Sequence, residues 1–408
     1  GSMDGVSNWA AMSLVTSGGN SYNGSSGFKI GADAADLIWE KANQVNVGIN
    51  AELFNGRLAL SVDGYYQKTS GLLYNISTLA TTGYTTRTAN IGSLENKGLE
   101  VMVSGKIFDG PFKWELATNL SYTKNKLLSL DGVLDMKING GGANTGKVMH
   151  ALMVGKPVSA FYMLRQDGIY QTDQEVPSKL YAKGVRAGDC KYFDYNNDGD
   201  ITDDDRMYVG KVTPDIYGGI TSTMNWKNFD LSIFCQFAAG GKILSAWKGC
   251  GGTEGTEHLG LASSSIKGYK NGTLVNSEQF YNISKYAANH YWRGEGTSNT
   301  VPRPTLAGTF AGGFGNNLVS TRYLEDASYF KFKTITLGYS LPHSLLSKIH
   351  VTGARIFVSL DNFFTLTKYS GYDPEFSYES NPTGNSYGAD FGEQATLKSF
   401  IIGASINF

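Results

Sequence analysis

The sequence has no run of apolar residues long enough for a membrane-spanning helix. Its longest uninterrupted apolar run covers residues 160–164, whereas a helix needs about 20 such residues to cross a bilayer. Charged residues make up only 17% of the 408 positions, and the formal net charge is −1. The chain therefore lacks the basic surplus of nucleic-acid-binding proteins, and we expect no nucleic acid among its partners.

Cysteine-based and catalytic motifs are also missing. Cys190, Cys235 and Cys250 show neither CxxC nor Cys/His spacing, which argues against a disulfide framework and a zinc site, so we expect ordinary packing. No HExxH, GxSxG or Walker-type GxxxxGK(S/T) pattern occurs, and the five histidines are scattered along the chain. We therefore expect that the protein is not an enzyme and has no catalytic residues.

What the sequence does contain is an alternation of apolar and polar residues with a period of two. In residues 43–67 the apolar positions of the first half alternate with polar ones, and the same pattern returns after Asn55-Gly56. A period of two indicates β-strands, and Asn-Gly is the preferred dipeptide of a type I′ hairpin turn. Residues 43–67 are therefore predicted to form one long β-hairpin.

The same alternation recurs along the chain and is joined by two kinds of connection. Further predicted strands cover residues 99–107, 112–123, 215–227, 231–237, 327–341, 354–366 and 397–408. Tight turns occur at Asn55-Gly56, Asp109-Gly110 and Lys227-Asn228, whereas other connections are long and rich in Gly, Ser, Asn and Thr. A soluble sandwich keeps its loops short and evenly spaced, but an outer-membrane barrel has short periplasmic turns and long extracellular loops. We therefore expect an all-β fold, a transmembrane antiparallel β-barrel, with its apolar strand faces on lipid and its polar faces on a wet lumen.

The alternation of short and long loops also predicts a strand count. Strand 112–123 should run outward and strand 215–227 inward, so an even number of strands should lie between them. Residues 147–165 are assigned two strands with a periplasmic turn at 155–157, which brings the total to 11. The last strand carries an apolar face that ends on Phe408, which resembles the C-terminal signal of outer-membrane barrels.

Residues 194–205, DYNNDGDITDDD, match the spacing of a 12-residue calcium loop. Calcium prefers six to eight oxygen ligands, and such a loop supplies them from positions 1, 3, 5, 7, 9 and 12. The corresponding ligands here are Asp194, Asn196, Asp198, the carbonyl of Asp200, Thr202 and Asp205. Gly199 stands at the sharp bend, but position 12 is Asp rather than the longer Glu. We expect a structural Ca²⁺ that braces an extracellular loop of residues 172–214; the alternative is an Asn/Asp/Gly-rich turn that binds no metal.

Several of these stretches together resemble the SusC/RagA-type TonB-dependent transporters of Bacteroidetes outer membranes. The resemblance runs in the order of the family from about residue 37 to the end of the chain. It rests above all on WEKANQVNVGINAELFNGRL (39–58), FDYNNDGDITDDDR (193–206), YLEDASYFKFKTITLGYSLP (323–342) and FVSLDNFFTLTKYSGYDPE (357–375).

The resemblance implies a 22-stranded barrel that is filled by an N-terminal plug and preceded by a TonB box. Because 11 is half of 22, residues 43–408 are expected to be the C-terminal half of such a barrel and residues 1–42 the remnant of an extracellular loop. The first half of the barrel and the plug would then be partners, present in the same chain, in a separate chain or in a cleaved one. Residues 1–3 are either native loop or a cloning remnant.

The resemblance also implies a function. It is TonB-dependent import of a large nutrient across the outer membrane, together with a SusD-like surface lipoprotein. The long loops suit an oligosaccharide and an oligopeptide equally. We expect residues 241–325 to pack over the barrel mouth and to contact the lipoprotein. A passive porin or a surface adhesin on the same barrel is the alternative, and a plug and TonB box upstream would decide between the two.

Overall fold

The computed structural model describes residues 37–77, 86–130, 149–250, 284–304, 315–346, 351–375, 386–392 and 394–407. It also describes the backbone of five short strands, namely β1 (Val15–Ser17), β2 (Phe28–Ile30), β9 (Met136–Ile138), β18 (Tyr269–Lys270) and β19 (Thr273–Leu274). Within these residues, no helix is both long enough and apolar enough to cross a membrane.

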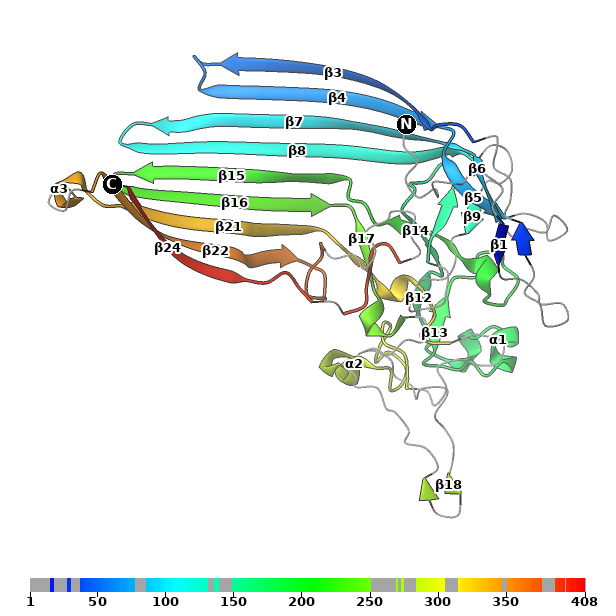
Figure 1. The fold of residues 1–408 in the computed structure, drawn as a ribbon. Helices are drawn as coiled ribbons and strands as arrows, with labels where there is room; N and C mark the ends of the chain where they lie inside the picture. Colours follow the sequence, from blue (N-terminus) through cyan, green and yellow to red (C-terminus); the bar gives the residue numbers. More distant parts are fainter. Residues whose placement is uncertain are drawn as a thin grey trace.

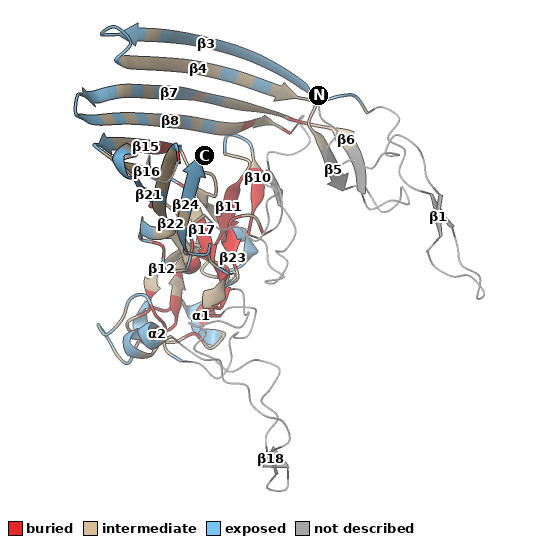
Figure 2. Cartoon of the chain, turned by 60° about the vertical axis from the view of Figure 1, so that its left-hand side comes forward, coloured by how far each residue is buried: buried red, intermediate tan, exposed pale blue. Residues whose placement is uncertain are grey.

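The main element is one antiparallel sheet of nine long strands that follow each other in chain order. Figures 1 and 2 show this sheet as a single curved wall. Its members are β3 (Lys41–Leu53), β4 (Leu58–Ser70), β7 (Ser93–Asp109), β8 (Phe112–Ser129), β15 (Ile216–Trp226), β16 (Phe229–Ala239), β21 (Tyr329–Ser340), β22 (Gly353–Thr367) and β24 (Ser399–Asn407). The predicted all-β, antiparallel fold is confirmed.

The tight turns and the long connections lie at opposite ends of the sheet, as the sequence predicts (Figure 1). The β3–β4 hairpin turns at Asn55 and Gly56, whose φ angles of 56° and 77° are both positive, as a type I′ turn requires. The β15–β16 hairpin turns at Lys227, where φ is 53°. Strand order and loop order therefore follow from local turn chemistry.

The predicted count of 11 strands is wrong, because residues 149–165, the described part of the predicted hairpin, do not enter the sheet. They contain β10 (Ala151–Met153), which pairs with β9, and β11 (Ala160–Met163), which pairs with β14 (Met207–Lys211). β8 pairs directly with β15, from Phe112 opposite Trp226 to Tyr122 opposite Ile216. All four residues of β11 are buried, whereas a barrel strand has one lumenal and one lipid-facing side. The expectation of an even number of strands between β8 and β15 still holds, because no strand of the sheet lies between them and zero is even.

The turn at 155–157 consequently lies at the end of the sheet opposite to the predicted one. The N–H of Leu127, near the end of β8 from which the long connections leave, donates to the carbonyl of Lys156 at 2.9 Å, and Gly155 donates to Leu127 at 2.8 Å. Leu127, Leu130 and Leu152 form a small apolar cluster there. The turn therefore belongs with the long connections, and its predicted periplasmic position is corrected.

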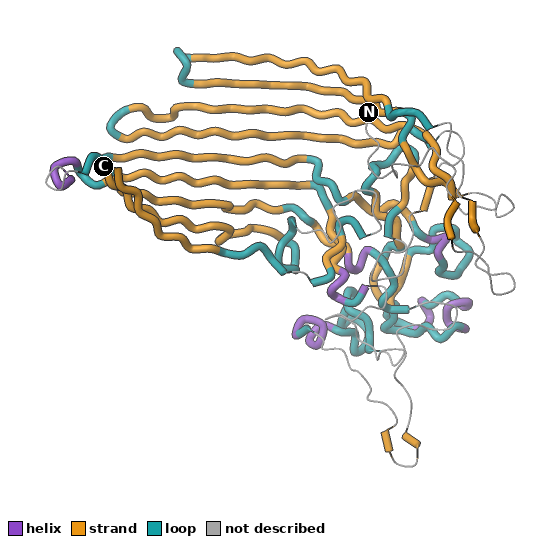
Figure 3. The backbone as a smooth tube through the Cα atoms, viewed as in Figure 1, coloured by secondary structure: helices purple, strands orange, loops and turns teal. Residues whose placement is uncertain are grey.

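The long connections fold into a compact unit at one end of the sheet, which we call the cap: residues 149–214, 241–250, 284–304, 315–328 and 369–392 where described. Its elements are β10, β11, β12 (Gln166–Ile169), α1 (Ser178–Ala182), β13 (Cys190–Tyr192), β14, β17 (Lys242–Ser245), α2 (Lys285–His290), β20 (Leu324–Asp326) and β23 (Ala389–Asp390). Buried residues concentrate here rather than in the sheet (Figure 2), and Figure 3 shows the helices gathered at the same place, apart from α3 (His343–Leu346). One core cluster includes Phe161, Met163, Leu244 and Tyr323, all fully buried. Burial of these apolar side chains stabilises the cap.

Candidate functional site

The nine-stranded wall has one polar and one apolar face, and the strand register shows both to be continuous. Starting from Asn50, successive partners across the sheet form a row that lies on the polar face. The members of this row are Asn50, Ser61, Met102, Asn119, Gly219, Gln236 and Lys331. The row beside it is apolar and includes Ile49, Val62, Val101 and Leu120. The predicted assignment of alternate residues to two different environments is therefore confirmed.

The polar face is the inner, concave one, as contacts between strands that are not neighbours show. Tyr65 of β4 reaches across β7 to Thr123 of β8, with 3.1 Å between the hydroxyls. Arg355 of β22 reaches across β21 to Asp230 of β16 at 2.9 Å. A side chain added at Gly338 of β21 would collide with this ion pair. Side chains converge on the concave side of a curved sheet, so the polar face lines the interior.

The opposite face carries large apolar side chains that are exposed in this chain, including Val47 at 69% and Ile402 at 66%. Aromatic residues gather on this face at the tight-turn end, where Phe108 lies 5.9 Å from Trp114 and Phe229 lies 4.7 Å from Tyr339. A band of apolar residues flanked by aromatic ones is the lipid-facing surface of an outer-membrane barrel. The sequence also predicts an aromatic girdle near the strand ends that includes Tyr65 and Phe408. Tyr65 points inward instead, toward Thr123, and Phe408 lies outside the described residues.

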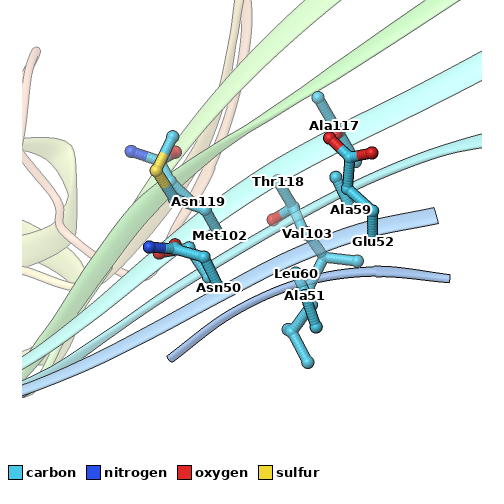
Figure 4. A pocket seen from close by; sticks show the side chains of 12 residues that line it. Asn50, Ala51, Glu52, Ala59, Leu60, Met102, Val103, Ala117, Thr118 and Asn119 are labelled. Atoms are coloured by element: carbon cyan, nitrogen blue, oxygen red, sulfur yellow. The ribbon is translucent and has the colours of Figure 1, made fainter. Parts of the chain in front are cut away.

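The inner face forms a shallow hollow of about 470 Å³ over the middle of β3, β4, β7 and β8. Figure 4 shows Asn50, Met102 and Asn119 projecting to one side of these strands and Leu60 to the other. Glu52 and Ser104 also line the hollow. Amide, hydroxyl and carboxylate groups can form hydrogen bonds with a polar ligand.

The predicted calcium loop folds around the carboxylate of Asp194. Its two oxygens accept the N–H groups of Asp198 at 3.2 Å and Gly199 at 2.8 Å, and Gly199 has φ of 77°. Asp205 at the other end of the loop is fully buried and accepts the N–H groups of Tyr195 and Thr202 at 2.9 and 2.7 Å. The loop therefore closes on its first and last carboxylates.

Two lysines of the α1 region also contact the loop. Lys183 donates to the carboxylate of Asp200 at 2.6 Å, and Lys179 donates to the carbonyl of Asp198. The hydrogen bond from Lys183 lowers the pKa of Asp200 below its usual range. Neither lysine contacts an atom of the predicted ligand set, which uses the carbonyl of Asp200 and the carboxylate of Asp198. In the part of the chain that the structure describes, no three His, Cys, Asp or Glu side chains form a group suited to hold a metal ion.

A buried ion pair in the cap was missed by the sequence analysis. Asp189 is fully buried and accepts from Arg303 at 2.9 and 3.0 Å and from the side-chain amide of Asn316 at 3.0 Å. It joins residues 149–214 to two segments of the predicted lid-contact loop, 241–325. Where described, that loop therefore packs against the other long connections, and no local pattern at Asp189 signals its distant partner.

The histidines and cysteines take structural places. His150 is buried and stacks on Phe161 with 4.7 Å between the ring centroids. Cys190, Cys235 and Cys250 are buried and form no disulfide bond, and burial raises the pKa of Cys190 to about 11. His258 and His350 lie outside the described residues.

Comparisons with known proteins agree with this two-faced wall. Residues 7–233 match the family model described as TonB dependent receptor-like, beta-barrel. The chain is 30% identical over 380 residues to TonB-dependent receptor P3 of Formosa agariphila, covering 91% of this chain and 34% of that protein. It is 26% identical over 384 residues to TonB-dependent receptor SusC of Bacteroides thetaiotaomicron, covering 91% and 32%.

The fold matches a solved structure as well. A chain of the RagAB peptide transporter superposes with a TM-score of 0.71 and 23% identity, covering 98% of this chain and 39% of that one. This chain thus spans about a third of the length of the relatives it matches. It belongs to the TonB-dependent receptor-like β-barrel family of the outer membrane.

Proposed function

We propose that this chain is part of a TonB-dependent importer that carries a large nutrient, an oligosaccharide or an oligopeptide, across the outer membrane. The observation that carries the proposal is the nine-stranded wall, polar inside and apolar outside, whose long connections all leave from one end. Such a wall offers a polar path through lipid. The similarity to SusC, and the fold shared with RagAB, support an importer rather than a passive pore.

The test uses the full-length gene in its own host. A deletion strain is grown on single oligosaccharides and on single oligopeptides, and is complemented with the intact gene or with one lacking the TonB box. We expect growth on one nutrient class to be lost and to return only with the intact gene. Restoration by both genes would indicate a porin, and unchanged growth with loss of surface attachment would indicate an adhesin.

The second part of the proposal is a SusD-like lipoprotein that covers the cap. The cap exposes aromatic rings, among them Tyr181 and Tyr286, which are 41% and 51% exposed. Tyrosine is enriched at protein interfaces because it combines a large apolar surface with a hydroxyl group. Co-purification of the lipoprotein should be lost when residues 255–285 are deleted and should survive a deletion within the 341–352 connection at the opposite end of the sheet. Retention of the lipoprotein by the first variant would refute this contact.

The third part is a structural calcium ion in residues 194–205. Support comes from the closed loop, in which Asp194 accepts two N–H groups of the bend and Asp205 is buried. The ligands would be Asp194, Asn196, Asp198, the carbonyl of Asp200, Thr202 and Asp205, and the ion would brace the cap. Calorimetry of the intact protein with and without a chelator tests this, with Asp194→Ala/Asp198→Ala as the variant that should no longer respond.

A further inference from the structure

The connection between β22 and β24 contains a segment that lies against the inside of the wall. We call residues 369–375 the strap. Lys331 of β21 stands in the row that contains Asn119 and Gln236, so its side chain belongs to the inner face. Yet Lys331 is only 2% exposed, although the wall is open on this side. The carboxylates that contact it belong to the strap, which therefore lies within the barrel mouth.

The end of the strap is held by four charged groups, of which Lys331 and Asp373 are buried and the other two partly buried. Lys331 pairs with both oxygens of Asp373, at 2.9 and 3.1 Å, and with Glu375. Lys333, the next lysine of the same strand, pairs with Glu375 at 2.9 Å, and the hydroxyl of Tyr329 donates to it at 3.0 Å. Two lysines thus face two carboxylates, so the charges balance.

The beginning of the strap is held by a separate set of contacts. The hydroxyl of Tyr369, which is buried, donates to Asp390, and the indole N–H of Trp247 donates to Tyr369 at 3.3 Å. The N–H and hydroxyl of Ser370 donate to Glu325 at 2.8 and 2.7 Å. Between the two anchors, Tyr372 is 81% exposed. The strap is therefore fixed at both ends, with one ring presented to the surroundings.

The pKa values of Asp373 and Glu375 show whether a fall in pH could release the strap. Burial by itself would raise the pKa of Asp373, but hydrogen bonds from Thr396 and Lys331 outweigh it and the pKa lies below the usual 3.8. At Glu375, burial would likewise raise the pKa, but hydrogen bonds from Lys331 and Lys333 outweigh it, so the pKa is lowered. The remaining neighbours are Tyr329, Gln236 and Thr396, none of which is charged near neutral pH. Both carboxylates are therefore ionised near neutral pH.

We propose that the strap is a stationary ledge inside the barrel mouth, pinned by buried Lys331, and that it does not act as a lid that opens during transport. We call the ion pairs that Lys331 and Lys333 make with Asp373 and Glu375 the pin, and release of the strap would have to break all of them together. Breaking a buried ion pair is strongly destabilising, so the strap stays in place. The proposal rests on the barrel geometry and not on the identity of the nutrient.

Lysine acylation of the full-length protein tests the pin. The protein is treated with sulfo-NHS-acetate and the modification of each lysine is followed by mass spectrometry. Lys368 lies just outside the strap and is exposed, so it serves as the internal reference. We expect Lys331 to react at least 10-fold more slowly than Lys368. In Asp373→Asn/Glu375→Gln it should react within about threefold of Lys368.

The matched control removes a carboxylate from the same inner face without touching the pin. Asp361 of β22 accepts from Ser399 at 2.9 Å, and in Asp361→Asn Lys331 should stay protected. Should the double variant fail to fold, Asp373→Asn alone, which keeps Glu375, should give an intermediate rate. Fast acylation of Lys331 in the wild type, or unchanged protection in both Asp373 variants, would overturn the pin.

The stationary character is tested in intact cells. Acylation is carried out with an energised membrane and again after a protonophore has removed the energy for TonB. A stationary ledge predicts the same Lys331 protection in both conditions, whereas protection that falls only in energised cells would show that the strap is a lid. Loss or retention of nutrient import does not enter this readout, so failure of the proposed function would be seen separately.

Discussion

Arginine scanning along β7 gives the sharpest check on which face of the wall meets lipid. Val101 lies between Val62 of β4 and Leu120 of β8, in the row of Ile49, which is the middle one of the five alternate apolar residues of β3. The next residue, Met102, lies on the inner face beside Ser61 and Asn119. An arginine that faces lipid at the bilayer midplane costs about 2–4 kcal/mol, and the cost falls to about 0–1 kcal/mol near the interfaces.

We therefore expect Val101→Arg to lower the free energy of unfolding of the full-length barrel by about 3 kcal/mol, or roughly 150-fold in the unfolding equilibrium constant. Met102→Arg should cost less than about 1 kcal/mol, because the new guanidinium enters a polar lumen. Leu60→Arg lies one row nearer the tight turns, some 7 Å from the middle at about 3.4 Å per residue, and should fall between the two.

The assay is urea-dependent unfolding of the full-length protein in phospholipid vesicles, followed by tryptophan fluorescence and by the heat-modifiable mobility of barrels on gels. Equal destabilisation by Val101→Arg and Met102→Arg would refute the assignment of the faces. A cost that rises from Val101 toward Leu60 would instead refute the position of the midplane.

The other predictions concern orientation, the cap, the metal and acid. A cysteine placed at Asn55 should resist an impermeant maleimide in intact cells while one at Tyr286 should react, and the reverse result would invert the barrel. Asp189→Ala should lower the stability of the cap by about 3 kcal/mol, because it leaves Arg303 without its buried partner. The control is Asp167→Ala, whose ion pair with Arg165 is more exposed and which should cost less than about 1 kcal/mol. Similar melting temperatures of the two variants would contradict the buried pair. A chelator should lower the melting temperature of the wild type but not of Asp194→Ala/Asp198→Ala, and no shift in either would leave only the turn. The pKa values of Asp373 and Glu375 are lowered, so the stability that these carboxylates contribute to the fold is present above the usual values of 3.8 and 4.5 and is lost as pH falls through the lowered values. Lys331 should therefore stay protected from acylation while carboxyl groups elsewhere begin to protonate. Loss of its protection already at pH 6 would contradict the ion pairs.

The strands, their faces and their turns could be predicted because their signals are local. A period of two needs only neighbouring residues to be visible, and it places Val47 on one face and Asn46 on the other without reference to any distant contact. The same holds for Asn55-Gly56, where the two residue types most tolerant of positive φ define the turn. The spacing of oxygen-bearing residues in 194–205 predicted a calcium loop, and the calcium stays a prediction. The structure adds that Asp194 and Asp205 accept backbone N–H groups within the loop and that two lysines approach it, neither of which the spacing predicted.

The hairpin at 147–165 shows where local signals fail. Residues 160–163 are apolar enough for a barrel strand, and nothing in the sequence distinguishes burial on both sides from one face on lipid. β11 pairs with β14, some 45 residues further along the chain, and this pairing places residues 160–163 in the cap rather than in the wall. The predicted count of 11 exceeded the observed nine by these two strands.

The contacts that fix the cap and the strap were also beyond the sequence. Asp189 and Arg303 are 114 residues apart, and Lys331 and Asp373 are 42 apart, so neither pair leaves a local pattern. The sequence by itself determined the amphipathic strands and the ends at which the chain turns, since both depend on neighbouring residues. Only the tertiary structure decided which strands enter the wall and which carboxylate meets which cation, because burial brings together side chains that no periodicity relates.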